Sequence, residues 1–281
     1  MHDCSVIMFQ EKDVRYIHCY TLDFSIEIHP HVHNCWEIAF VKSGELIYTA
    51  DGKSADVKPG SLIISPPGRL HFLNPKGTII YDRHVLFIPE ECMDKTILEQ
   101  VPQDLFVLDA ADNSMISGIF ERVYYYVTSL PPEEARSALL SIGNELMINI
   151  LLAIRNSPCS VNVITDPLIV RVLDYINDHI RESLSVPQIS NAMSVSSGHM
   201  HRHFIKHMHM TPKQYIMQQK LLLVQQALVS GANPTEICRQ YGFGNYSTFY
   251  RNYQKTYGCR PSDNPRQSPL DDPSLPHPPG G

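Results

Sequence analysis

The spacing of apolar residues divides the chain into regions with different periods. From about residue 16 to residue 88, apolar runs of four residues, at 38–41, 46–49, 61–64 and 78–81, alternate with turn sequences rich in glycine and proline. Such runs predict β-strands, and Asp51-Gly52 between two of them predicts a hairpin. Residues 1–110 are therefore expected to form a small β-sandwich or β-barrel, a fold that can hold a ligand inside.

After Asp112 the apolar residues recur at helical spacing, which predicts two linking helices, about 114–129 and 133–156, within residues 111–160. The second helix has two apolar stripes. The first contains Leu139, Ile142, Leu146, Ile150 and Ala153, and the second contains Leu140, Met147, Leu151 and Ile154. One stripe can pack on the β domain and the other on a second copy of the chain. We therefore expect a homodimer, with packing of both stripes inside one chain as the alternative.

Residues 157–162 have no period and are interpreted as a linker, beyond which residues 161–263 are expected to be entirely helical. Capping side chains, combined with prolines or with carboxamide and carboxylate side chains, predict six helix starts in this region. These starts are Asp166, Ser185, Ser196, Thr211, Asn233 and Asn245. The proline-rich tail, 264–281, cannot build a core and is expected to be disordered.

The charges are distributed unevenly along the chain. The net charge of the whole chain is −6, but residues 1–166 carry −10, residues 167–262 carry +6 and the remaining tail carries −2. Residues 167–262 also contain six of the fourteen histidines. The negative charge of the whole chain argues against a nucleic-acid partner. A basic helical module attached to an acidic body is compatible with one.

Composition narrows the class of protein. The chain has 281 residues, of which 43% are hydrophobic, enough for two domains with buried cores. No run approaches the roughly 20 apolar residues that a membrane span needs, and the start of the chain lacks a secretion signal. The seven cysteines are scattered and form no C-x-x-C pair, so we expect reduced thiols. The expectation is a soluble cytoplasmic protein with no membrane contact.

Two stretches of the helical region, about 186–207 and 234–257, share the layout of a short helix, a tight turn and a second helix with a polar start. In the second helix of each unit, apolar residues four apart predict the buried side, and the other positions face outward. In such a helix arginine can read guanine in the major groove, whereas lysine suits phosphate. The predicted DNA contacts are Ser197, Gly198, His201, Arg202 and Lys206 in the first unit and Tyr246, Ser247, Tyr250, Arg251 and Lys255 in the second.

The second unit contains Ile237-Cys238, Gly242-Phe243, Phe249-Tyr250-Arg251, Gly258 and Pro261-Ser262. This pattern closely resembles the signature of the AraC/XylS family of bacterial transcription regulators. The first unit resembles it too, although His209 stands where the family usually has glycine; histidine tolerates a positive φ better than most residues. The resemblance implies sequence-specific binding to double-stranded DNA and control by a small-molecule effector, which in this family could be a sugar. It also implies RNA polymerase as a partner if the protein is an activator.

The β region contains H-x-H-x3-E-x6-G from His31 to Gly44, and then Pro66-x-Gly68-x2-His71. These two stretches resemble the paired motifs of cupin barrels. The resemblance implies that His31, His33, Glu37 and His71 can hold one divalent transition metal, such as iron, manganese, nickel or zinc. In the alternative the pocket holds no metal and binds an effector. The candidate effector contacts are His31, His33, Glu37, Tyr48 and His71, with His29 as a further candidate.

The fold class expected is therefore α+β and multidomain: a cupin-like β domain (1–110), two linking helices (111–160), an all-α domain with two helix-turn-helix units (161–263) and a tail (264–281). The expected function is transcription regulation without catalysis. A metal-dependent cupin enzyme, such as a dioxygenase or isomerase, would explain only the first third of the chain. A DNA-binding protein whose barrel serves only in dimerisation would have no pocket ligand.

Overall fold

The computed structural model describes residues 4–24, 28–77, 79–102, 104, 106–156, 163–229 and 231–263. The predicted linker at 157–162 and the predicted tail at 264–281 lie outside these residues. The chain divides into two compact units, the first extending to Ile164 without Asp51–Lys53 and the second beginning at Thr165 and including Asp51–Lys53.

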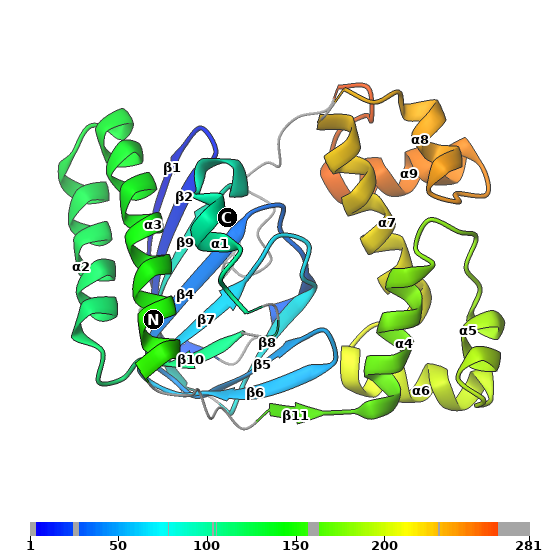
Figure 1. Cartoon of the computed structure of the whole chain (residues 1–281), viewed down its shortest axis with the longest axis horizontal. Coiled ribbons are helices and arrows are strands. Elements are labelled where there is room, and N and C mark those ends of the chain that lie inside the picture. Colours follow the sequence, from blue (N-terminus) through cyan, green and yellow to red (C-terminus); the bar gives the residue numbers. More distant parts are fainter. Residues whose placement is uncertain are drawn as a thin grey trace. The chain divides into compact units, whose positions relative to one another are not determined.

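The first unit contains two β-sheets (Figure 1). The larger sheet has the strand order β1-β2-β9-β4-β7-β10, and the smaller one has the order β11-β6-β5-β8-β3. The strands are β1 (Cys4–Glu11), β2 (Val14–Phe24), β3 (Ile28–His31), β4 (Trp36–Ser43), β5 (Leu46–Ala50), β6 (Lys53–Val57), β7 (Ser61–Ser65), β8 (His71–Pro75), β9 (Ile79–Ile88), β10 (Val107–Asp109) and β11 (Val163–Thr165). The predicted runs are found in β4, β5, β7 and β9. At the predicted hairpin, Asp51 and Gly52 have φ values of 48° and 72°, the left-handed backbone that a two-residue hairpin turn requires.

Three strands were not expected from the sequence. β1 precedes the region in which the pattern predicts strands, and β10 is only three residues long. The expectation that everything beyond the linker is helical is wrong at β11, which joins β6 at the edge of the smaller sheet. Strands as short as β10 and β11 have too few residues to show a period, so pairing with a neighbouring strand decides them.

Two hydrophobic cores lie on opposite faces of the larger sheet. The inner core fills the space between the two sheets and includes Ala39, Val41 and Tyr48. The outer core joins Trp36, Ile38 and Phe40 to the helices that cover the other face. Alternation along β4 thus sends Trp36 outward and Glu37 inward, as a two-residue period requires.

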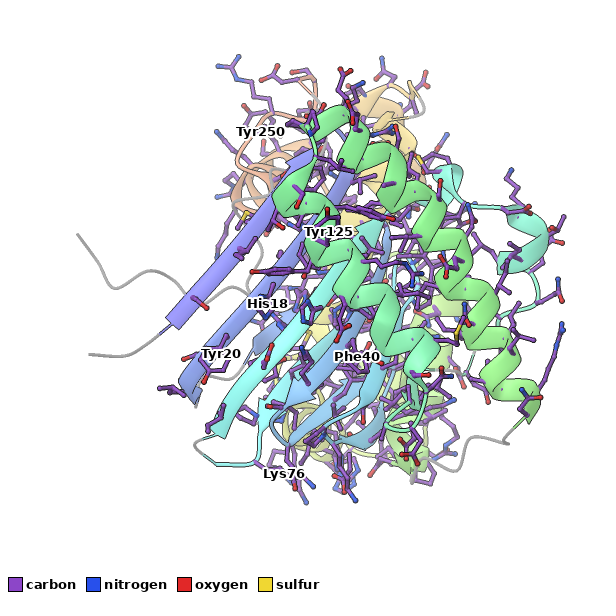
Figure 2. The ribbon with its side chains drawn as sticks, turned by 90° about the vertical axis from the view of Figure 1, so that its left-hand side faces the viewer. His18, Tyr20, Phe40, Lys76, Tyr125 and Tyr250 are labelled. Carbon is purple, nitrogen blue, oxygen red and sulfur yellow. The ribbon has the colours of Figure 1, made fainter. Side chains whose placement is uncertain are left out.

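Two long antiparallel helices, α2 (Ser114–Ser129) and α3 (Pro132–Asn156), cover the outer core, as Figures 1 and 2 show. Both agree closely with the predicted bounds. A 3-10 helix (Glu90–Cys92) and the short α1 (Lys95–Leu98) connect β9 to β10.

The prediction for the second stripe of α3 needs correction. Met147 and Leu151 are buried in the same core as the first stripe, and Leu140 and Ile154 are partly buried against it. Both predicted stripes therefore pack inside one chain. The apolar residues that α3 leaves exposed are Ile148 (45%) and Leu152 (46%). Neighbouring residues on a helix are only about 100° apart around its axis. The two stripes therefore form one broad apolar face, which a single surface can cover.

By length and composition alone, α3 is long and apolar enough to cross a membrane, although no such run was expected from the sequence. In the structure, one side of this helix packs on the β domain. The residues buried there are Ala135, Leu139, Ile142, Gly143, Leu146, Met147, Ile150 and Leu151.

The second unit is built from α4 (Pro167–Asp178), α5 (Val186–Ala192), α6 (Ser197–Met208), α7 (Pro212–Val229), α8 (Pro234–Gln240) and α9 (Tyr246–Tyr257). All six predicted starts are found. At all six of them the predicted side chain accepts a hydrogen bond from an amide in the first turn of the helix. Thr211 hydrogen-bonds Gln214 at the start of α7. These capping contacts are local, which explains why the sequence predicts them well.

Candidate ligand site and DNA-binding surface

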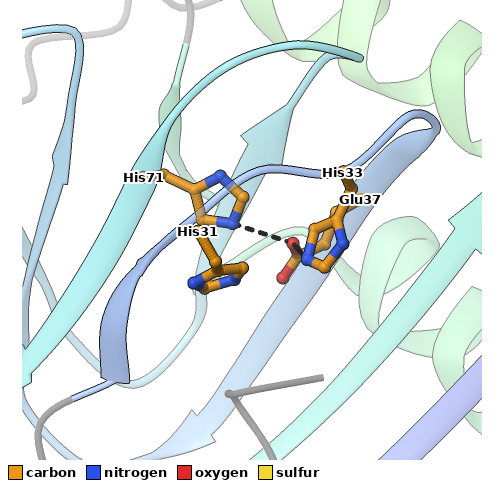
Figure 3. Close-up of side chains that lie close together, drawn as sticks. All are labelled: His31, His33, Glu37 and His71. Carbon is orange, nitrogen blue, oxygen red and sulfur yellow. Dashed lines mark hydrogen bonds and ion pairs between the residues drawn. The ribbon is translucent and has the colours of Figure 1, made fainter. Parts of the chain in front are cut away.

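The structure brings together the four predicted metal or effector residues inside the β domain (Figure 3). His31 ends β3, His33 lies in the following loop, Glu37 is on β4 and His71 begins β8. All four side chains are buried, and their potential ligand atoms lie within 4.8 Å of one another. The close approach of His31 and His71 follows from the strand register, in which they are direct partners.

Glu37 is the centre of this cluster, which we call the barrel cluster (His31, His33, Glu37 and His71). Its Oε2 lies 2.9 Å from Nε2 of His71 and 3.1 Å from Nε2 of His33. Burial alone would raise the pKa of this carboxyl, but His71 and His33 hold its pKa well below the usual range. The carboxylate is therefore ionised and available to a cation.

The orientation of His71 defines what the barrel cluster can bind. Its Nδ1–H donates to the carbonyl oxygen of Arg69 over 2.9 Å, because a carbonyl can only accept. Its Nε2 then faces the carboxylate of Glu37. Two lone pairs at that separation repel each other, so the arrangement is stable only with a proton or a metal ion between them. A backbone carbonyl that orients a histidine in this way is typical of metal ligation.

The other predicted effector contact, Tyr48, lies beside the barrel cluster. Its ring centroid is 5.7 Å from that of His71, and its hydroxyl forms a 2.7 Å hydrogen bond with the hydroxyl of Ser65. The side chain of His29 lies outside the described side chains. All five effector candidates named from the sequence thus come together in one interior.

Two residues of this interior were missed from the sequence. Arg83 and Tyr81 on β9 are fully buried, with the Arg83 guanidinium 5.4 Å from the centroid of the Tyr81 ring. Arg83 pairs with Val41 and Cys19, which both belong to the inner core. A charged residue alternating with apolar ones, as in Tyr81-x-Arg83-x-Val85, was the available signal. Arg83 can present a positive charge to a bound anion.

The predicted DNA contacts of the first unit lie on α6. Met200, Phe204 and Met208 bury one side of this helix. On the remaining surface Gly198, Arg202 and Lys206 are exposed, whereas Ser197 and His201 are half-buried. The Ser197 hydroxyl hydrogen-bonds that of Ser190. The helix ends at His209, whose φ of 52° is the left-handed value that histidine was expected to tolerate.

The predicted contacts of the second unit lie on α9 in the same way. Phe249 and Tyr253 are buried. On the rest of the helix Tyr246, Ser247, Arg251 and Lys255 are exposed and Tyr250 is half-buried. Gly258 ends the helix with φ 68°.

The turn that precedes α9 depends on Gly242, which has φ 60°. A Cβ at this position would lie 2.6 Å from the backbone of Glu182. The buried Lys220 of α7 donates hydrogen bonds to the carbonyl oxygens of Glu182 and Gly242, which fixes the turn from the other side. Only glycine can occupy such a position without strain.

Comparison with known proteins agrees with this division. The profile of a helix-turn-helix domain matches residues 189–267, and that of a cupin domain matches residues 23–78. An uncharacterized HTH-type transcriptional regulator of Escherichia coli, YdiP, is 23% identical over 261 residues, covering 84% of this chain and 80% of that protein. A XylDLEGF operon transcriptional activator of Pseudomonas putida is 21% identical over 254 residues, covering 85% and 77%. A crystal structure of the AraC-like transcriptional activator CuxR aligns with 15% identity over 85% of this chain and 86% of that one, with a TM-score of 0.41.

The paired helix-turn-helix units, joined to a cupin-like domain, define a transcription regulator. In both of its domains the chain is similar to transcription regulators of the AraC/XylS type.

Proposed function

We propose that this regulator binds DNA through α6 and α9 and that a small-molecule effector bound at the barrel cluster controls this binding. The observation that carries the proposal is the convergence of four buried polar side chains inside the β domain. Three imidazoles and one carboxylate gathered in a buried interior can offer a bound ligand both hydrogen-bonding and charged partners. Control requires that the effector bind the DNA-competent state with a different affinity from the other state.

A divalent transition metal is proposed as part of this site. Three imidazoles and one carboxylate are a donor set that iron, manganese, nickel and zinc accept. The position of His71 Nε2, which faces the carboxylate of Glu37 over 2.9 Å, supports the proposal. In the site His31, His33, Glu37 and His71 would hold the ion, and the ion would supply a positive centre to which an anionic or hydroxyl group of the effector can bind.

The buried Arg83 favours an effector with an anionic group over the neutral sugar that the family resemblance suggests. A guanidinium binds a carboxylate or phosphate through two hydrogen bonds and an opposite charge. A neutral sugar carries no such charge. Arg83→Gln should therefore weaken the binding of carboxylates more than that of sugars.

The test begins with selection of DNA from a random duplex library by the full-length protein at physiological salt, followed by sequencing. Two enriched half-elements about one helical turn apart are expected, because two reader helices on one face of DNA contact successive major grooves. Absence of enrichment would refute the regulator proposal for these surfaces.

The barrel cluster is tested on the same protein by elemental analysis and by thermal unfolding with candidate carboxylates and sugars. Glu37→Gln/His71→Gln should lose both the bound metal and the shift in Tm caused by the effector. Tyr48→Phe is the matched control, because it removes one hydroxyl and keeps the ring. It should weaken the binding of the effector and leave the metal content unchanged.

We also propose that the protein acts as a dimer in the cytoplasm, and that it is an activator that contacts RNA polymerase. The name of the Pseudomonas relative describes that protein as a transcriptional activator. The exposed Ile148 and Leu152 of α3 support the dimer, as does Tyr125 of α2, which is 62% exposed and is labelled in Figure 2. Ile148→Glu/Leu152→Glu should lower the mass measured by light scattering from that of two chains to that of one. A monomer mass for the unchanged protein at micromolar concentration would refute the dimer.

An enzymatic role of the cupin-like domain is the second candidate, because the same four side chains could hold a catalytic metal. It predicts turnover by the metal-loaded protein, whereas the regulator predicts only binding. The named relatives are regulators, which supports the non-enzymatic role.

A further inference from the structure

A second group of histidines and a carboxylate lies in the helical unit, away from the barrel cluster. His203 and His207 are four residues apart on α6 and therefore share one face of the helix. Their Nε2 atoms lie 2.7 Å and 3.4 Å from the same oxygen, Oδ2 of Asp166. These three potential ligand atoms lie within 4.8 Å of one another.

The other oxygen of Asp166 is already used. Oδ1 accepts hydrogen bonds from the backbone amides of Leu168 and Ile169, each 3.0 Å long, and so caps α4. This contact fixes the orientation of the carboxylate and directs Oδ2 towards α6. Burial alone would raise the pKa of Asp166, but the amide of Ile169 and the side chain of His203 lower it.

We propose that Asp166, His203 and His207 form a metal site for Zn²⁺ or a similar divalent transition ion, which fastens the recognition helix α6 to the start of α4. Two imidazoles and one carboxylate suit such an ion, and a water molecule can complete its coordination. With bonds of about 2.1 Å, tetrahedral ligand atoms lie roughly 3.4 Å apart. The observed separations of 2.7 Å and 3.4 Å therefore need only small side-chain rotations.

The exposure of this site is suited to ion exchange with solvent. The side chains of His203, His207 and Asp166 are 26%, 33% and 18% exposed. Arg202 and Lys206, the predicted DNA contacts, are the residues immediately before the two histidines in the sequence. Metal binding at this site would make the stability of the helical unit depend on metal, independently of any metal in the barrel cluster.

The experiment measures zinc bound per full-length chain by equilibrium dialysis and elemental analysis, together with the Tm. Asp166→Asn is the informative change, because asparagine caps a helix as well as aspartate but supplies no carboxylate. Asp166→Asn and His203→Gln/His207→Gln should each lose one zinc per chain and the rise in Tm that zinc causes at this site. Single histidine changes should weaken zinc binding by about tenfold or more.

Two further variants separate this site from the barrel cluster. Glu37→Gln/His71→Gln should retain the zinc that Asp166→Asn removes, whether or not the barrel cluster binds metal. His199→Gln, which changes an exposed histidine of the same helix outside the set, should bind as much zinc as the unchanged protein. Equal zinc content and affinity in the unchanged protein, Asp166→Asn and His203→Gln/His207→Gln would overturn the proposal and leave only an ion pair.

Discussion

The barrel cluster and the Asp166 cluster contain the same chemical groups, imidazoles and one carboxylate, but they differ in burial. The side chains of Glu37 and His33 are 4% and 9% exposed, whereas those of Asp166 and His207 are 18% and 33% exposed. Inside the β domain, every charge must be balanced by another group of the protein or by a ligand. On the helical unit, water shares this task. The same residue types therefore contribute differently to stability in the two units.

The largest difference in the free energy of unfolding is expected between Glu37→Gln and Asp166→Asn, each of which removes one carboxylate charge. Glu37→Gln leaves His33 and His71 without their carboxylate in a buried site and should lower the free energy of unfolding by about 3–5 kcal/mol. Asp166→Asn keeps the helix cap and breaks a half-exposed ion pair, so its effect should stay below about 1 kcal/mol after solvent screening. Urea unfolding at pH 7 with a chelator measures both, and equal losses would contradict the comparison.

The next effect concerns acid stability and a histidine outside both clusters. His84 of β9 is buried beneath α2, where the Tyr16 hydroxyl hydrogen-bonds its Nδ1. Burial, helped by His18 and Lys42, lowers the pKa of His84 to about 3. An unfolded imidazole has a pKa of about 6.5, so between these values the unfolded chain binds more protons and stability falls as pH falls.

This loss should reach about 4 kcal/mol between pH 7 and pH 3, since about three pKa units are crossed and one unit corresponds to about 1.4 kcal/mol. His84→Gln, which can still accept from Tyr16, should reduce the acid loss, as measured by urea unfolding at several pH values. His199→Gln, at an exposed position of α6, is the control and should leave the pH dependence unchanged. Identical pH profiles for His84→Gln and the unchanged protein would show that His84 does not control acid stability.

A smaller effect is expected from the arginines of the helical unit. Arg202→Ala and Arg251→Ala should each cost about 1–3 kcal/mol of binding free energy at one base position, because a bidentate contact to guanine discriminates by that amount. Binding to the selected DNA and to DNA changed at single positions measures this. Equal loss on selected and random DNA would show that these arginines do not read bases.

The smallest effect is expected from Lys206→Ala and Lys255→Ala. A lysine that contacts phosphate releases counterions, so each change should weaken binding to all sequences and reduce the slope of log affinity against log salt by about one. Titrations at several salt concentrations on selected and random duplexes check this. A loss confined to the selected sequence would contradict the phosphate assignment.

Local signals in the sequence predicted much of this fold. The capping side chains at Asp166, Ser185 and Asn245, the hairpin at Asp51-Gly52 and the two helix-turn-helix layouts involve residues close together in the chain. Their hydrogen bonds and backbone angles form largely within one turn of structure, so the residue types determine them. The resemblance of the stretches around His31 and His71 to cupin motifs also indicated the barrel cluster, although 34 residues separate His71 from Glu37.

Contacts between distant segments decided the rest. The pairing of β11 with β6, the burial of both stripes of α3 and the inward position of Arg83 depend on which surface each segment meets. The same holds for the meeting of Asp166 with His203 and His207, since 37 residues separate Asp166 from His203. The sequence by itself determined where helices begin and which residue types are present. Only the tertiary structure decided which of these groups face one another, because that requires the packing of whole elements.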